Sequence, residues 1–286
     1  MELSQVQRVW IRLIACAVNG EKPEPEQIKT ITPPSLYELA DNHSMLSVTA
    51  MALESAGITE HNFNQAKTKA LRKLGLFDIE RKAIFRELEA AGIRHCPLKG
   101  IILKDYYPEF GMREMTDNDI LCDAERMEEI REIMERLGYT CESFGEENHD
   151  VYSKPPCLEF EMHRSLFNKE KTPLYYEYYS DVFSRLKHIG GCEYRFSDED
   201  FYIYLIAHEY KHFSFNGTGM RSLLDVYVFL RACPQLDRGC IDRELEKLNL
   251  SEFEESNRTL AFKVFTGEKL SDDETEELMI YLDSTL

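Results

Sequence analysis

Two aspartates stand two positions apart in the segment Met115-Thr116-Asp117-Asn118-Asp119-Ile120-Leu121-Cys122, at the start of a short apolar run. Because strand side chains alternate with a period of two, we expect Asp117 and Asp119 to point the same way. Neighbouring carboxylates repel each other unless a cation lies between them. Mg²⁺ prefers hard oxygen ligands of this kind, completed by substrate phosphates. The pair therefore predicts a site for Mg²⁺ or Mn²⁺ at the mouth of a strand.

A third carboxylate is expected from a neighbouring strand. Residues 158–163 alternate between an apolar and a polar side chain, which places Glu159, Glu161 and His163 on one face. Either glutamate fits the role, and we favour Glu161. Three acids arranged in this way can hold two metal ions about 3.5–4 Å apart, which activate an attacking hydroxyl and stabilise a leaving phosphate group.

Basic residues precede the aspartates and fit a phosphate-bearing ligand. Lys99 and Gly100 stand where a strand is expected to meet a helix N-terminus, a position that favours anions. Arg113 follows Gly111 and offers a planar fork of donors for a triphosphate.

The composition limits the class of partner. The formal net charge is −18, which disfavours broad binding to nucleic acid or to anionic membranes. No apolar run approaches membrane-spanning length, and the N-terminus does not resemble a secretory signal. Eight scattered cysteines without a C-x-x-C pair indicate reduced thiols. We therefore predict a cytoplasmic protein that does not enter a membrane.

The hydrophobic periodicity changes twice along the chain. Residues 1–90 follow helical spacing, with runs at 36–56 and 64–91. Short apolar strands are then expected at 93–98, 118–122, 149–153 and 158–165, with an amphipathic helix at 124–137. From residue 197 onward the pattern is helical again. The order predicts an α+β fold in which a small mixed sheet is flanked by helical segments.

At this point the residues resemble a known family. The segments LKGIILKDYYPEFGMREMTDNDILCD and LEFEMHRSL are similar to the uncharacterised-nucleotidyltransferase branch of the polymerase-β-like superfamily, over roughly residues 77–232. The resemblance implies metal binding by Asp117 and Asp119, completion of the triad by Glu161, and a triphosphate near Lys99 and Gly100. The superfamily's usual phosphate loop is Gly-Ser, whereas this chain has Lys-Gly.

A competing motif lies further along the chain. His208-Glu209-Tyr210-Lys211-His212 has the H-E-x-x-H spacing of zinc proteases, which puts both imidazoles on one helix face. No third ligand is obvious, the nearest acid on a favourable face being Asp225. We therefore expect His208 and His212 to be structural or to line the cleft, and Asp225 to pair with Arg221 four residues away.

The sequence thus predicts a helical segment at 1–76, a nucleotidyltransferase α/β core at 77–196 and a helical domain at 197–286. The expected reaction moves a nucleoside monophosphate from a nucleoside triphosphate to an unidentified acceptor hydroxyl, with release of pyrophosphate. A small-molecule or protein acceptor is favoured over nucleic acid. Two alternatives remain open: a zinc hydrolase that uses His208, Glu209 and His212, and an inactive nucleotide-binding protein.

Overall fold

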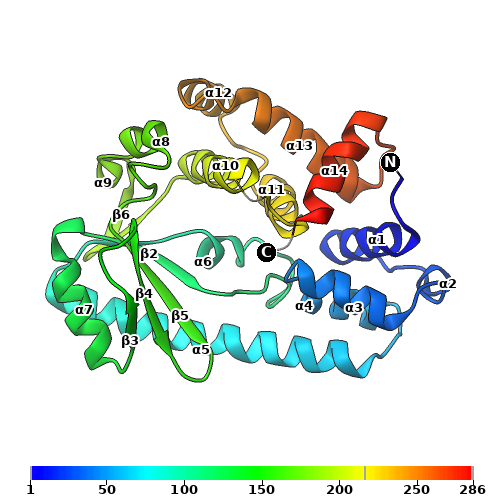
Figure 1. Cartoon of the computed structure of the whole chain (residues 1–286), viewed down its shortest axis with the longest axis horizontal. Coiled ribbons are helices and arrows are strands. Elements are labelled where there is room, and N and C mark those ends of the chain that lie inside the picture. The colour runs from blue at the N-terminus through cyan, green and yellow to red at the C-terminus, as the bar shows by residue number, and fades with distance from the viewer. Residues whose placement is uncertain (1, 216, 285–286) are drawn as a thin grey trace.

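One mixed sheet of seven strands forms the left half of the molecule in Figure 1, with strand order β3-β4-β5-β2-β1-β7-β6. The computed structural model describes residues 2–215 and 217–284. The strands are β1 His95–Pro97, β2 Asn118–Cys122, β3 Thr140–Ser143, β4 His149–Lys154, β5 Leu158–His163, β6 Lys187–Gly190 and β7 Glu193–Arg195.

The centre of the sheet is the parallel pair β2 and β5, in which Asp119 lies opposite Glu161. One face of β5 is apolar and packs on helices α5 (His61–Ala91) and α7 (Met127–Arg136). Phe160 is fully buried there and meets the Phe77 ring edge-on at 5.6 Å. The alternation of β5 therefore turns its acidic residues to the opposite face of the sheet, as the sequence predicts.

Most of the other helices lie above the sheet or to its right in Figure 1. In Figure 1 the first and last helices of the chain both lie at the right, and α5 runs beneath the sheet toward that side. The bounds are α1 Gln5–Asn19, α2 Pro25–Ile28, α3 Pro33–Asn42, α4 Leu46–Ser55, α6 Gly100–Leu103, the 3₁₀ turn η1 Ala124–Arg126, α8 Pro173–Tyr178, α9 Val182–Arg185, α10 Asp198–Phe215, α11 Met220–Ala232, α12 Arg238–Lys247, α13 Ser251–Thr266 and α14 Asp272–Asp283.

The predicted α+β class is confirmed, because helical segments precede and follow the strands of the mixed sheet along the chain. The expected boundary between residues 76 and 77 falls inside the continuous helix α5. Helices from 1–76 and from 197–286 also share one hydrophobic core, in which Trp10 and Phe265 are both fully buried. The division of the chain into units at 1–76, 77–196 and 197–286 stays a prediction. None of the described helices is long and apolar enough to cross a membrane.

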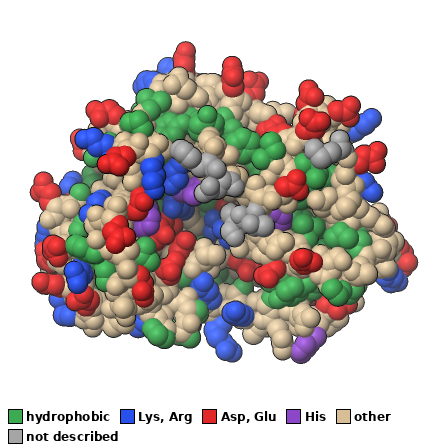
Figure 2. All heavy atoms as spheres, in the orientation of Figure 1, with side chains coloured by type: hydrophobic (Ala, Val, Ile, Leu, Met, Phe, Trp, Pro, Cys, Tyr) green, Lys and Arg blue, Asp and Glu red, His purple; other side chains and the backbone are tan. Residues whose placement is uncertain are grey.

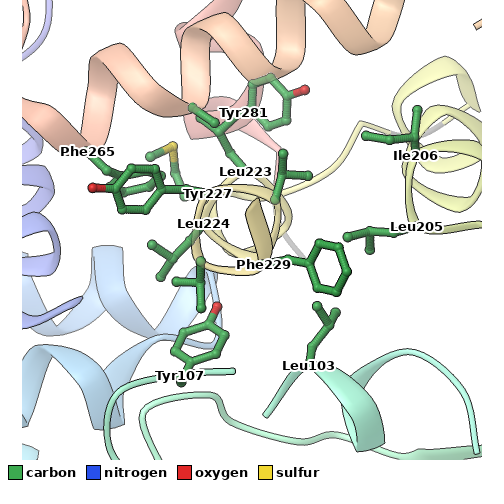
Figure 3. Close-up of a cluster of buried hydrophobic side chains, with 14 of the residues drawn as sticks. Leu103, Tyr107, Leu205, Ile206, Leu223, Leu224, Tyr227, Phe229, Phe265 and Tyr281 are labelled. Carbon is green, nitrogen blue, oxygen red and sulfur yellow. The ribbon is translucent and has the colours of Figure 1, made fainter. Parts of the chain in front are cut away.

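Helix α11 lies at the centre of that shared core. Figure 3 shows its side chains surrounded by Leu103 and Tyr107 from the α6 region, Leu205 from α10, Phe265 from α13 and Tyr281 from α14.

A buried ion pair joins α11 to the segment that leads into β2. Arg113 donates from Nε and Nη2 to the two carboxylate oxygens of Asp225, each at 2.8 Å, and Tyr107 donates to Asp225 Oδ1 at 2.7 Å. Both charged side chains are less than a tenth exposed. The pair fixes the sheet against the C-terminal helices.

Replacement of Asp225 by alanine should destabilise the fold strongly, because it leaves the Arg113 charge buried without a partner. The expected cost is about 3–5 kcal/mol in urea unfolding. Glu21→Ala breaks the exposed pair with Arg12 and is the matched control, expected to cost less than about 1 kcal/mol. Similar losses in both variants would contradict this account of the ion pair.

Candidate active site

A cleft of about 440 Å³ separates the sheet from helices α10 and α11. Lys99, Asp117, Asp119 and Glu161 line its sheet side. The opposite wall carries the polar side chains of His208, Lys211, His212 and Arg221. Acidic side chains are scattered over the face seen in Figure 2, many of them around its rim, and some Lys, Arg and His side chains show nearer its middle. The cleft thus has an acidic wall facing a basic one.

Three carboxylates converge on the sheet side. Asp117 stands directly before β2, and oxygens of Asp117, Glu159 and Glu161 all lie within 4.8 Å of one another. The parallel register that sets Asp119 opposite Glu161 explains why separate stretches of chain meet here. Burial, and then the negative charge of Asp119, raise the pKa of Asp117 to about 6. A cation bound between these groups would relieve that repulsion.

Asp119 is the most enclosed of these acids and is already neutralised by neighbours. Its Oδ1 atom lies 2.6 Å from Lys99 Nζ and 2.9 Å from His163 Nε2. Burial alone would raise the pKa of Asp119, yet the charge of Lys99 and the His163 hydrogen bond hold it well below its ordinary value. Asp119 is therefore ionised and paired.

Lys99 and Gly100 form a tight turn from β1 into α6. Lys99 has φ 41° and ψ −115°, a conformation that residues with a Cβ rarely adopt. A Cβ on Gly100 would lie 2.5 Å from Arg113 Nη1, so only glycine fits at this position. The loop is strained and closely packed.

The structure corrects the prediction for Arg113. Its guanidinium is buried and held by Asp225, which leaves it no open fork of donors for a triphosphate. The predicted pair between Arg221 and Asp225 is also wrong, because Asp225 binds Arg113 and Tyr107 instead. Neither partner could be read from spacing, since Arg113 and Asp225 lie 112 residues apart.

Two cations that the sequence analysis did not assign to the site face the acids. In the part of the chain that the structure describes, neither Lys211 nor Arg221 forms an ion pair, and Arg221 Nη1 is buried without a hydrogen bond. Burial lowers the pKa of both groups, and nearby cations add to this: Lys99 for Lys211, and Arg113 for Arg221. The sequence carries no signal for this role of Arg221 beyond its place in the first turn of α11.

A histidine that the sequence reasoning missed also borders the site. His149 Nε2 lies 3.6 Å from Glu161 Oε2, and His163 Nε2 lies 3.3 Å from the same oxygen. Ligand atoms of these three residues lie within 4.8 Å of one another. His149 comes from β4, which pairs with β5 directly opposite His163.

The H-E-x-x-H residues do not form a zinc protease site. His208 and His212 do share a face, with their Nε2 atoms 3.2 Å apart, and both line the cleft. Glu209 points elsewhere: it is buried, and its Oε1 accepts a hydrogen bond of 2.8 Å from Asn257 on α13. Among the described residues no third histidine, cysteine or acid joins the pair in a possible metal site.

Glu209 should make the stability of the fold depend on pH. Burial raises its pKa from 4.5 to about 8, and its Oε2 has no partner among the described residues. The folded state therefore favours the protonated carboxyl of Glu209. The stability that the fold has with this carboxyl protonated is complete below pH 4.5 and is lost as pH rises to about 8. Relative to wild type, Glu209→Gln should gain roughly 2–4 kcal/mol between pH 5 and pH 8 in urea unfolding.

The exposed Glu276→Gln on α14 is the matched control for that measurement. Its stability curve should run parallel to that of the wild type over the same pH range. A Glu209→Gln curve that is also parallel to the wild type would show that the buried carboxyl does not titrate as stated.

Comparison with known proteins identifies a family for this chain. A family model described as "Uncharacterised nucleotidyltransferase" matches residues 29–266. The match extends beyond residues 77–232 into the helices on both sides. No curated protein and no solved structure matches the chain. Because the family model spans most of its 286 residues, the chain belongs to the uncharacterised nucleotidyltransferase family.

Proposed function

We propose that the protein moves a nucleoside monophosphate from a nucleoside triphosphate to an acceptor hydroxyl. The hydroxyl oxygen forms a bond to the α-phosphorus, the bond from that phosphorus to the β-bridging oxygen breaks, and pyrophosphate leaves. The observation that carries the proposal is the convergence of Asp117, Glu159 and Glu161 beside Asp119, in a chain of the nucleotidyltransferase family.

The donor set fits a divalent cation such as Mg²⁺ or Mn²⁺. Oxygens of Asp117, Glu159 and Glu161 lie close enough to share one ion, and hard carboxylate oxygens are the ligands that Mg²⁺ prefers. When bound, the ion would neutralise phosphate charge and lower the pKa of the attacking hydroxyl. We assign Asp117, Asp119 and Glu161 to this role, as the sequence suggests, and add Glu159 as a further ligand.

The basic wall of the cleft fits the triphosphate. Lys211 and Arg221 have no carboxylate partners among the described residues and face the acids, so phosphate oxygens would satisfy them. Lys99 and Gly100 would border the phosphates from the sheet side. Arg113 takes a supporting role, because it packs against Gly100 while its own charge is held by Asp225.

The acceptor proton would pass to a carboxylate of the same cluster. Glu161 is partly exposed to the cleft and lies beside His163 and His149. A proton taken up by Glu161 would pass from it to one of these imidazoles. The net charge of −18 favours a small-molecule or protein hydroxyl over a nucleic-acid end. A cytoplasmic location stays a prediction from the cysteine pattern.

Asp117→Asn should weaken nucleotide binding by tenfold or more, because it removes a metal ligand without changing the size of the side chain. The measurement is titration calorimetry with ATP and the other common nucleoside triphosphates, with and without Mg²⁺. The exposed Glu128→Gln on α7 is the matched control and should bind like the wild type. Binding that does not need Mg²⁺, or equal affinities for wild type and Asp117→Asn, would count against the metal site.

The same preparation separates an enzyme from an inactive binding protein. Nucleotide labelled at the α-phosphate is incubated with candidate alcohols, sugars and proteins, and transfer of the label is followed. Metal-dependent binding without transfer to any acceptor would favour the inactive alternative.

Arg221→Met should raise the stability of the fold and weaken nucleotide binding together. The variant removes a buried charge whose Nη1 has no partner, which favours folding, and it also removes a phosphate donor. We expect a higher melting temperature and an ATP affinity reduced at least fivefold. Arg12→Met, at an exposed position on α1, is the control. A fall in melting temperature with unchanged affinity would assign Arg221 a purely structural role.

A further inference from the structure

The contacts of Asp119 restrict how it can bind metal. Lys99 Nζ at 2.6 Å and His163 Nε2 at 2.9 Å both engage Oδ1. Among the described residues no hydrogen bond reaches Oδ2. Asp119 therefore presents a single unoccupied oxygen to the cleft, while its other oxygen is shared by two nitrogen donors.

Two divalent ions in one site need carboxylates that bridge them, usually with one oxygen on each ion or one oxygen between both. The aspartate that should bridge here cannot do so while Lys99 holds Oδ1, because a divalent ion at that oxygen would lie within a few ångströms of the ammonium and be repelled by it. The remaining acids, Asp117, Glu159 and Glu161, meet around one position.

The backbone keeps the Lys99 ammonium in place. The residue adopts φ 41° directly before the short helix α6, and Leu98 N donates to Asp119 O at 2.9 Å across the adjoining strands. This local geometry directs the lysine stem back over β2 toward Asp119. A strained backbone at a charged residue in a cleft indicates that the position of the charge matters.

We infer that Lys99 takes the place of one of the two metal ions, so that the site works with a single divalent cation. The ion would bind Asp117, Glu159, Glu161 and Oδ2 of Asp119, and the ammonium would supply the second positive charge beside the phosphates. This rests on the proposed function only for the identity of the phosphate ligand. The role of the lysine is independent of whether transfer occurs.

The number of bound ions tests the inference directly. Free Mn²⁺ is counted by its electron paramagnetic resonance signal as it is titrated into protein saturated with α,β-methylene-ATP, which cannot transfer its nucleotide. Wild type should bind one Mn²⁺ per chain at micromolar levels. Lys99→Gly, which removes the ammonium and relieves the positive φ, should bind two.

Two further variants keep the result interpretable. Lys99→Met removes the charge but retains the stem and the backbone strain, so it should also bind two Mn²⁺ and serves if the glycine variant does not fold. Lys171→Ala removes an exposed lysine that pairs with Glu147 outside the cleft, and should still bind one. Two ions on the wild type, one on both Lys99 variants, or two on Lys171→Ala would each overturn the inference.

The number of bound Mn²⁺ ions tests the single-ion inference separately from the proposed transfer reaction. If no labelled nucleotide is ever transferred, yet one Mn²⁺ binds to wild type and two bind to Lys99→Gly, only the transferase proposal fails. If the wild type transfers nucleotide with two Mn²⁺ bound, only the single-ion inference fails.

Discussion

Repulsion among carboxylates is the constraint on which the arrangement of this molecule depends. The parallel pairing of β2 with β5 sets Asp119 opposite Glu161 and brings Asp117 and Glu159 beside them, in a cleft partly shielded from water. Such a group of charges is unfavourable in a folded protein unless cations offset it. The fold provides Lys99 and His163 for Asp119, and the imidazoles of His163 and His149 lie within ion-pair distance of Glu161. Among the described residues, no cation lies within that distance of Asp117 or Glu159. The uncompensated part of the cluster is the part that suits a metal ion.

The opposite wall has the complementary excess. Arg221 and Lys211 come from α11 and α10, helices that belong to the shared hydrophobic core rather than to the sheet. Their position relative to the acids depends on the Arg113–Asp225 pair, which ties the segment before β2 to α11. One buried ion pair therefore sets the spacing between an acidic wall and a basic wall. A phosphate chain with a bound cation is complementary to both walls at once.

Sequence reasoning succeeded where a local pattern determines the structure. The bounds of β2 were predicted to the residue, and the alternation of β5 correctly placed its glutamates away from the core. It failed where the structure depends on residues far along the chain, or where the segment carries no hydrophobic pattern. All four residues of β6 are exposed, so this strand carries no hydrophobic alternation, and the single run expected at 36–56 is divided where Ser44 adopts φ 53°. The roles of Arg113 and Arg221 were misjudged because their surroundings come from residues far along the chain.

The Lys-Gly turn shows how a departure from a familiar motif can be understood physically. A Gly-Ser loop offers a flexible backbone and a neutral hydroxyl to phosphate. Here the residue with positive φ is Lys99, whose side chain makes that conformation unfavourable by about 1–3 kcal/mol. The following glycine is required for a different reason, since Arg113 occupies the space of a Cβ. A strained residue persists only when its surroundings over-determine it, and the contact that does so is the ion pair with Asp119. The loop thus carries a fixed positive charge where a Gly-Ser loop has a neutral hydroxyl, and that charge is paired with Asp119 across the adjoining strands.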